Sequence, residues 1–346
     1  MAPSPSNSVV TAIAGMTASR AAHTATLLPD GQVLIAGGFD AEHGLSSAEL
    51  FDPATRTFSP TGPMSVARYS HTATLLPNGK VLIAGGYNGD YLSSAELYDP
   101  AARQFIPAGQ MTVARHDQLA VLLSSGKVLL VGGVGVGYEF LSSAELYDPA
   151  TGAFALTGSM ATPREGHMLT LLADGRALIT GGHQGRHSEI IIHASAEIYN
   201  PATGAFTPTG SMTLKRHKHD ATLLSNGKVL ISGGSDERDD RGAYRSAETY
   251  DPQTGIFTWA GNMTTARYKH QGTSVLLKDG RVLLMGGAAS AELYDPATGV
   301  FNPLSTGTGA MRLFATTTLL PDGAVLLTGG YGPNIAASAK AWLFIP

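Results

Sequence analysis

The sequence predicts an all-β protein, a seven-bladed propeller of four-stranded sheets, on the basis of three signals that recur in step along the chain. The segment SAELYDP returns with small changes, paired glycines return seven times, and one arginine precedes each glycine pair. Self-similarity at a fixed period is typical of repeat architectures. The SAELYDP copies begin at Ser47, Ser94, Ser143, Ser195, Ser246 and Ser290, and we place a degraded seventh copy at Ser338. The glycine pairs begin at Gly37, Gly85, Gly132, Gly181, Gly233, Gly286 and Gly329, and the arginines are Arg20, Arg68, Arg115, Arg164, Arg216, Arg267 and Arg312. The interval between the two is constant except in the sixth repeat, which has a two-residue insertion.

Each repeat contains four short apolar runs separated by turn signals, which predicts four strands. In the second repeat these runs are residues 71–76, 81–84, 95–98 and the stretch around Phe105. Asn-Gly or Asp-Gly joins the first two runs and supplies the positive φ of a tight hairpin, while Asp-Pro-Ala-Thr-Gly joins the last two. Seven such sheets in series hide most of their edges when they pack radially about an axis.

The two ends of the chain are expected to close the ring together. The last repeat reaches Pro346 without a fourth strand, and residues 9–14 precede Gly15-Met16 as the outer strand precedes Met in other repeats. We therefore expect one N-terminal outer strand to join three C-terminal strands. Residues 1–8 (MAPSPSNS) are interpreted as a flexible leader and residues 9–346 as a single domain.

The composition excludes several functional classes. Cysteine is absent, which excludes disulfides, cysteine nucleophiles and cysteine metal sites. A net charge of -4 without a basic block argues against nucleic acid as a partner. No apolar run approaches the length of a membrane span. We expect a monomer of bacterial type. The compartment is not fixed by these features, although a soluble secreted or periplasmic protein is favoured over a cytoplasmic one.

The pattern resembles the kelch repeat, which has a glycine pair closing one strand, a tyrosine on the next strand and an aromatic residue after the following turn. The tyrosine positions are Tyr98, Tyr147, Tyr199, Tyr250 and Tyr294, with Phe51 in the first repeat, and the later aromatics are Phe58, Phe105, Phe154, Phe206, Phe257 and Phe301. The resemblance covers residues 9–346 and implies a propeller, but the family includes both enzymes and binding modules. Galactose oxidase-like members need a Cys–Tyr copper radical cofactor, which a chain without cysteine cannot form. The Glu, Asp and His spacing of plant nitrile-specifier-like members is also missing.

The repeats provide an internal comparison, because positions that all repeats share are needed by the fold and positions that vary are free to carry function. The shared arginines, the Glu of each SAELYDP copy and a His three residues after the Arg are therefore interpreted as structural. We expect the Arg and Glu to form a repeated buried ion pair, which Lys340 breaks in the seventh repeat. The shared histidines are His23, His71, His167, His219 and His270.

The variable positions gather at the end of the propeller where the glycine pairs lie, since antiparallel neighbours place the start of the first strand beside the end of the second. The residue after each Arg is Ala21, Tyr69, His116, Glu165, His217, Tyr268 and Leu313. The residue after each glycine pair is Phe39, Tyr87, Val134, His183, Ser235, Ala288 and Tyr331. The longest loops, which follow His183 and Ser235, fall in the fourth and fifth repeats. We therefore expect the site at this mouth of the channel, near blades three to five.

Three interpretations of this mouth stay open. His116, Glu165 and His217 occupy one repeat position in consecutive blades and could hold a divalent transition metal, with His183, His187, His193, Asp117 and His219 nearby. The same side chains, with Tyr69 and Tyr268, could instead bind a ligand or move protons without metal. A channel rim could also carry polar residues with no ligand site at all. Tyr69, Tyr87, Tyr138, Tyr268 and Tyr331 could stack on a sugar or aromatic ligand, and Phe39 is a further ligand-binding candidate at the same rim. Residues 236–241 lack the order of an EF-hand and are expected to form a solvated loop.

Two functions follow from these residues. In the first, the mouth is the active site of a lyase, hydrolase or isomerase that acts on a small polar or carbohydrate substrate. In the second, it recognises a peptide or glycan without chemistry.

Overall fold

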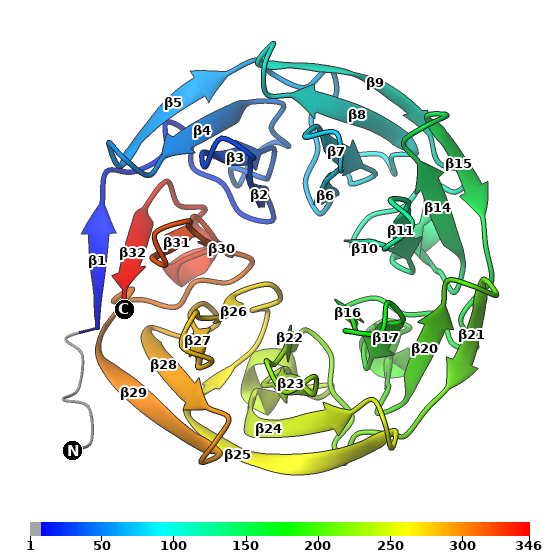
Figure 1. The fold of residues 1–346 in the computed structure, drawn as a ribbon, viewed down its shortest axis with the longest axis vertical. Helices are drawn as coiled ribbons and strands as arrows, with labels where there is room; N and C mark the ends of the chain where they lie inside the picture. The colour runs from blue at the N-terminus through cyan, green and yellow to red at the C-terminus, as the bar shows by residue number, and fades with distance from the viewer. Residues whose placement is uncertain (1–7) are drawn as a thin grey trace.

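Seven antiparallel four-stranded sheets surround a central channel in the computed structural model, which describes residues 8–346 (Figure 1). Residues 1–7 of the expected leader lie outside the described residues. Blade one consists of β2 (Thr24–Leu27), β3 (Val33–Ala36), β4 (Ala48–Asp52) and β5 (Thr57–Thr61). Blade two consists of β6 (Thr72–Leu75), β7 (Val81–Ala84), β8 (Ser94–Asp99) and β9 (Gln104–Gln110). Blade three consists of β10 (Leu119–Leu122), β11 (Val128–Val131), β14 (Ala144–Asp148) and β15 (Ala153–Leu156). Blade four consists of β16 (Met168–Leu171), β17 (Ala177–Thr180), β20 (Ala196–Asn200) and β21 (Ala205–Pro208). Blade five consists of β22 (Asp220–Leu223), β23 (Val229–Ser232), β24 (Tyr244–Asp251) and β25 (Ile256–Arg267). Blade six consists of β26 (Ser274–Leu276), β27 (Val282–Leu284), β28 (Ser290–Asp295) and β29 (Val300–Gly307). The first strand of each blade is innermost. The predicted all-β, seven-bladed fold is thus confirmed.

The seventh sheet combines the two ends of the chain. Its strands are β30 (Thr316–Leu319), β31 (Val325–Thr328) and β32 (Ala341–Ile345), with β1 (Val9–Ile13) antiparallel to β32 on the outside. Figure 1 shows β1 and β32 side by side at the point where the ring meets. The N-terminal strand therefore covers an edge that the C-terminal strands alone would leave unpaired.

Within residues 8–346 the hydrophobic core is divided into seven clusters, each shared by neighbouring blades. Between blades one and two, for example, Leu34 and Leu50 belong to the same cluster as Val81, Ile83 and Tyr98. Middle strands such as β3 and β7 are buried along their whole length, because both of their faces meet another sheet. The stability of each blade therefore depends on the presence of its neighbours.

The predicted Arg–Glu ion pair is present in blades one to six. The guanidinium nitrogens lie 2.7 to 3.1 Å from the carboxylates, and every one of these side chains is almost completely buried. In blade three, Arg115 also donates to the carbonyls of Gly132 and Ser143, while Glu145 accepts the N–H groups of Thr112 and Val113. The pair therefore ties the glycine pair, the third strand and the incoming loop together at the mouth end of the blade.

The expected break in this series at Lys340 is wrong by two residues. The third residue of the second strand faces Glu49 in blade one, and its equivalent Leu327 faces Trp342 in blade seven. The seventh copy of the repeat therefore begins at Lys340 rather than at Ser338, and Trp342 occupies the place of the glutamate. The guanidinium of Arg312 lies 4.8 Å from the Trp342 ring, so a cation–π contact replaces the ion pair. Trp342 was not predicted because Ser338-Ala339 matches the first two residues of the repeat, and this match was given more weight than the strand pattern of residues 341–345.

Four of the five shared histidines bond to the blade before their own, as expected for structural residues, namely His23, His71, His219 and His270. His71 lies 3.0 Å from the hydroxyl of Thr24, and His219 lies 2.9 Å from that of Thr180. Burial lowers the pKa of His71 to about 3, so the ring is neutral at physiological pH. In blade three Gln118 takes this place and donates to the carbonyl of Ala84. The first glycine of a pair has positive φ, and a Cβ on Gly37 would meet the Arg68 carbonyl and the His71 ring.

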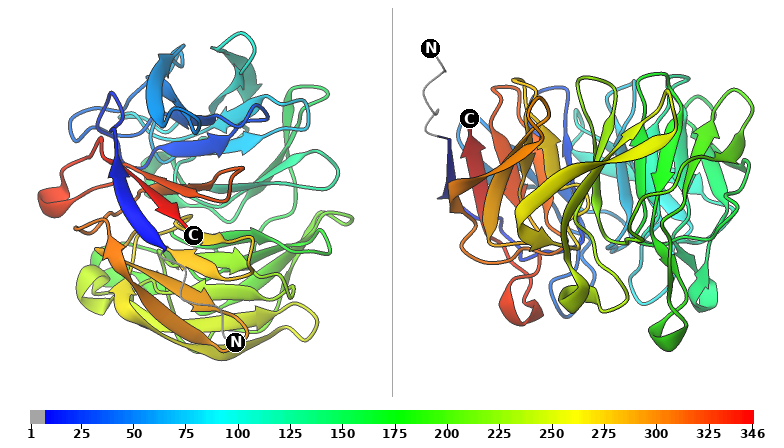
Figure 2. Two further views of the ribbon diagram at one scale, coloured as in Figure 1. Left: turned by 60° about the vertical axis from the view of Figure 1, so that its left-hand side comes forward. Right: turned by 90° about the horizontal axis from the view of Figure 1, so that it is seen from below.

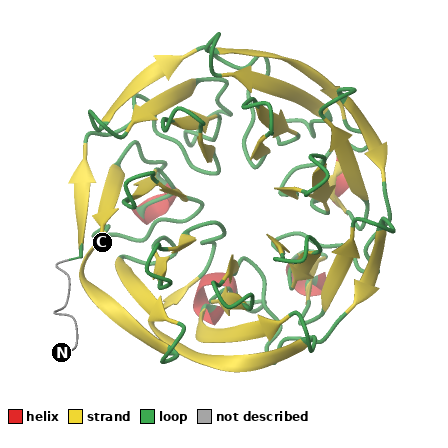
Figure 3. Ribbon diagram, in the orientation of Figure 1, coloured by secondary structure: helices red, strands yellow, loops and turns green. Residues whose placement is uncertain are grey.

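The two faces of the propeller differ in their loops. The short helices η1 (Val136–Tyr138), η2 (His187–Glu189), η3 (Asp239–Gly242) and η4 (Pro333–Ile335) project from one face (Figures 2 and 3). The ribbons β12 (Val134–Gly135) with β13 (Glu139–Phe140), and β18 (His183–Gln184) with β19 (Ile191–Ile192), accompany η1 and η2. The other face carries the short hairpin turns. None of the helices formed by residues 8–346 is long and apolar enough to cross a membrane.

Candidate functional site

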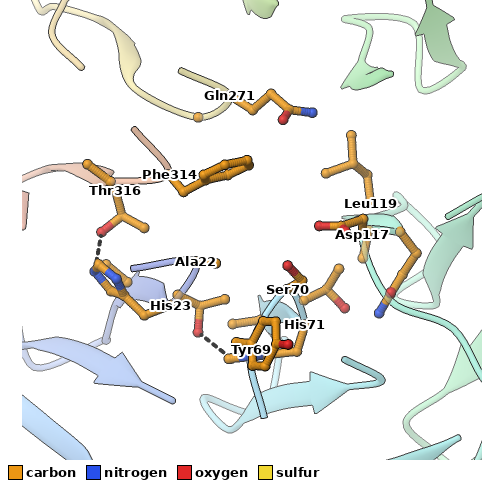
Figure 4. A pocket seen from close by; sticks show the side chains of 18 of the residues that line it. Ala22, His23, Tyr69, Ser70, His71, Asp117, Leu119, Gln271, Phe314 and Thr316 are labelled. Carbon is orange, nitrogen blue, oxygen red and sulfur yellow. Dashed lines mark hydrogen bonds between the residues drawn. The ribbon is translucent and has the colours of Figure 1, made fainter. Parts of the chain in front are cut away.

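A cavity of about 510 Å³ lies in the channel, at the start of the innermost strands. Figure 4 shows the side chains that surround it, from blade one through blades two and three to blades six and seven. Tyr69, Phe314 and Tyr331 contribute aromatic rings, whereas Asp117, Glu165, Lys218 and Gln271 contribute polar groups. The cavity is therefore asymmetric.

The rim pairing expected from the sequence is present in six blades. The residue after the Arg forms a β-bridge with the residue after the glycine pair, as in Tyr69 with Tyr87 and Glu165 with His183. The residue one place further along the chain lines the cavity in every blade except blade six. In all seven blades it has the left-handed backbone conformation, with φ between 50° and 64°. These residues are Ala22, Ser70, Asp117, Gly166, Lys218, Lys269 and Phe314.

The seven left-handed residues form a belt of hydrogen bonds around the channel. The backbone N–H of one blade donates to the carbonyl of the previous blade at six junctions, with distances of 2.7 to 3.0 Å. The seventh junction, from the N–H of Gly166 to the carbonyl of Asp117, makes no such bond within residues 8–346. The left-handed conformation costs a non-glycine residue about 1 kcal/mol. Because the backbone conformation is the same in all seven blades, the backbone does not account for the variety of side chains at this position.

The two-residue insertion of the sixth repeat partly bridges the channel. Asp220 accepts the N–H groups of Gly272, Thr273 and Ser274, which fixes the inserted turn against blade five. Gln271 then reaches over blade five, and its amide donates to the His167 carbonyl of blade four at 3.1 Å. The insertion thus adds a polar amide to the cavity lining.

Two carboxyl groups face the cavity in different electrostatic states. The Nδ1 atom of His116 lies 2.7 Å from Asp117. Burial opposes ionisation of Asp117, but the bond to His116 and a hydrogen bond from Ser70 outweigh it and lower the pKa of Asp117. The same contact raises the pKa of His116 against the effect of its burial. Burial and the negative charge of Asp117 together raise the pKa of Glu165 to about 7.

The expected metal triad is not gathered into one group of ligands. His116 pairs with Asp117, whereas the Nδ1 atoms of His183 and His217 lie 3.0 Å apart. Glu165 is 3.7 Å from His183. Burial lowers the pKa of His183 to about 3 and that of His217 to about 4. Among residues 8–346, no three His, Asp or Glu side chains are arranged to hold a metal ion. One shared repeat position does not bring the three side chains together, because His116 turns toward Asp117, whereas Glu165 and His217 both lie near His183.

An aromatic cluster extends from the cavity across the rim of blades one to three. Phe39 packs on Tyr69 with ring centroids 4.9 Å apart, and Tyr69 packs on Tyr87 at 5.7 Å. Tyr87 continues to Tyr91 and His116. Of these rings Tyr69 lines the cavity, and Phe39 and Tyr87 pack against it.

The structure places four of the predicted site residues on the cavity wall, namely Tyr69, Asp117, Glu165 and Tyr331. The other predicted residues do not line the cavity, namely Phe39, Tyr87, His116, His183, His217 and Tyr268. The prediction missed Ser70, Lys218, Gln271 and Phe314, which line the cavity. Three of them occupy the left-handed position, and comparing the repeats one residue further along would have found them.

The comparisons with known proteins agree with this architecture. The family model for the kelch motif matches residues 20–65 and 68–112. A fungal alcohol oxidase of the AA5 family, solved in complex with copper, superposes with a TM-score of 0.77 at 17% identity, over 99% of this chain and 77% of that chain. At this identity the likeness shows the fold alone. A search of curated proteins finds no significant match. The comparisons therefore show kelch motifs in the first two repeats, and the structure shows a seven-bladed β-propeller.

Proposed function

We propose that the channel mouth binds a small polar molecule, such as a carbohydrate, and transfers protons to and from it. The observation that carries the proposal is that two carboxyl groups with opposite pKa shifts face one cavity. Pairs of titratable groups whose surroundings separate their pKa values are typical of acid–base sites. Glu165 is assigned as the general acid, and Asp117, kept ionised by His116, as the general base.

The surroundings of these groups support binding of a sugar-like molecule. Tyr69 and Tyr331 provide ring faces on which a sugar can stack, while Gln271 and Ser70 provide hydrogen-bonding groups. The N–H of Gly166 and the carbonyl of Asp117, which do not bond to each other within residues 8–346, lie at the same junction as the two carboxyl groups. A ligand at this junction can accept a hydrogen bond from the N–H of Gly166 and donate one to the carbonyl of Asp117.

A metal is not part of this proposal, because His116, Glu165 and His217 do not form a ligand group. Elemental analysis of protein purified without chelator provides the check. A stoichiometric transition metal that is lost in Glu165→Gln would restore the metal-dependent interpretation.

The proposal is tested by incubating the protein with sugars and sugar acids in D2O and following the products by NMR. We expect deuterium incorporation, isomerisation or cleavage with at least one compound, and a loss of about 100-fold or more in Glu165→Gln and Asp117→Asn. Glu189→Gln is the matched control, because Glu189 is an exposed carboxylate on the same face. Conversion that both cavity variants retain would refute the assignment.

A second candidate function is recognition of a peptide or glycan without chemistry. The loop tips that surround the mouth favour it, since the side chains of Val136 and Ile335 are 70% and 72% exposed. Large exposed apolar residues around a cavity are typical of binding surfaces. Tight binding of a compound that is never converted would support this candidate over the first.

A further inference from the structure

Two lysines from neighbouring blades share the left-handed position next to the cavity. Lys218 and Lys269 follow the residue after the Arg in blades five and six, and the N–H of Lys269 donates to the Lys218 carbonyl at 2.9 Å. In the other five blades this position holds Ala, Ser, Asp, Gly or Phe. The fold therefore does not require a cation here, yet two adjacent blades have one.

The two ammonium groups share a single carboxylate that comes from a loop. Asp239 on η3 lies 3.1 Å from the Nζ atom of Lys218 through one oxygen and 3.0 Å from that of Lys269 through the other. The side chains of Lys218 and Lys269 are 17% and 20% exposed, whereas that of Asp239 is 39% exposed. The cations are thus held near the channel by strained backbone, and their counter-ion approaches from the solvent side.

This arrangement differs from the other lysine–aspartate pairs of the molecule. Lys80–Asp99, Lys127–Asp148 and Lys228–Asp251 recur at the hairpin turns of the opposite face, with one lysine for each aspartate. A carboxylate shared by two lysines leaves a net positive charge and unused N–H donors, since each ammonium has three. Because the side chain of Asp239 is 39% exposed, a competing anion can approach the two lysines from the solvent and displace it.

We infer that Lys218 and Lys269 form the anchor for a carboxylate group of the ligand, and that Asp239 is a displaceable internal substitute for that group. The inference rests on the proposed function, because Lys218 lines the same cavity as Glu165 and Asp117. The present contacts of Asp239 show that one carboxylate can reach both ammonium groups at hydrogen-bonding distance. The substrate class becomes a sugar acid or a related polar carboxylate, whose ring extends from the lysines of blades five and six toward Tyr69 and Tyr331.

The inference is tested by calorimetric titration with sugar acids that include D-glucuronate, and with D-glucose and D-glucose 6-phosphate as comparisons. We expect at least one sugar acid to bind about tenfold or more tightly than its uncharged counterpart, and Lys218→Met and Lys269→Met to remove this difference. Asp239→Asn should tighten binding of the sugar acid and leave that of the neutral sugar unchanged. Lys228→Met is the matched control, because it breaks a lysine–aspartate pair of the same blade on the opposite face.

Four outcomes would overturn the inference. Equal binding of sugar acid and neutral sugar, insensitive to the lysine variants, would remove the anchor but leave the proposed function intact. Weaker binding in Asp239→Asn would show that Asp239 positions the lysines instead of competing with the ligand. Lysine-dependent binding of the phosphate ester alone would assign the anchor to phosphate rather than carboxylate. Absence of binding by every sugar acid would also contradict it, whereas loss of the proposed function would appear separately, as conversion that Glu165→Gln does not affect.

Discussion

Removing one carboxylate of the buried ion-pair series should destabilise the whole propeller. In Glu145→Leu, the guanidinium of Arg115 loses its counter-ion, and the N–H groups of Thr112 and Val113 lose their acceptor. Both charged side chains are 0% exposed, so water cannot replace the lost contacts. Breaking a buried pair by removing one partner costs 3 to 5 kcal/mol, and we expect a loss of about 4 kcal/mol in the free energy of unfolding.

The assay is urea unfolding followed by tryptophan fluorescence and circular dichroism. The matched control is Lys127→Met, which removes an ion pair of the same blade whose side chains are 44% and 29% exposed. That variant should lose about 1 kcal/mol or less. If Glu145→Leu loses no more than the control, the Arg–Glu pair does not stabilise the blade, and the reasoning is refuted.

Three further predictions concern ring closure, pH and the cavity. Deleting residues 1–15 removes β1 and exposes the edge of β32, so the melting temperature should fall and aggregation should increase, whereas an unchanged melting temperature would argue against closure by β1. The pKa values of His71 and His167 fall from 6.5 to about 3 on folding, so the unfolded chain binds more protons and stability should be lost as pH falls from about 6.5 toward 3. His71→Gln, which introduces the side chain that Gln118 provides in blade three, should weaken this dependence in urea unfolding at several pH values, and an unaltered dependence would contradict the assignment. Asp117→Asn removes a negative charge that raises the pKa of Glu165, so the carboxyl ¹³C shift of Glu165 should titrate at lower pH, and a midpoint that stays the same would assign the raised pKa to burial alone.

The fold was predictable because seven copies of one template separate structural residues from variable ones. The Arg–Glu pairs, the linking histidines and the hairpin turns all follow from that comparison. Trp342 could not be predicted from that comparison, because the last copy keeps the strand pattern of the repeat but not its amino acids. The pairing of Leu327 with Trp342 establishes the register of β31 and β32.

The gathering of variable residues at this mouth was predictable from the sequence, but the residues that line its cavity were predictable only in part. Tyr69, Asp117, Glu165 and Tyr331 line the cavity, yet the His116 side chain turns to Asp117 and that of His217 to His183. Sequence comparison assigns a side chain to a position on a strand, but it does not give the rotamer chosen among competing partners. The comparison ended at the residue after the Arg, whereas the next residue, which is left-handed in every blade, also varies; this is why Lys218 and Lys269 were missed.

The central claim is that ligand binds in the channel cavity on the face that carries η1 to η4. The most direct measurement is a crystal structure of the protein soaked with the tightest sugar acid from the calorimetric panel. We predict ligand density that contacts Glu165 and Tyr69, with its carboxylate between Lys218 and Lys269 and with Asp239 displaced. Ligand bound only among the Asp-Pro-Ala-Thr-Gly turns of the opposite face would contradict the account.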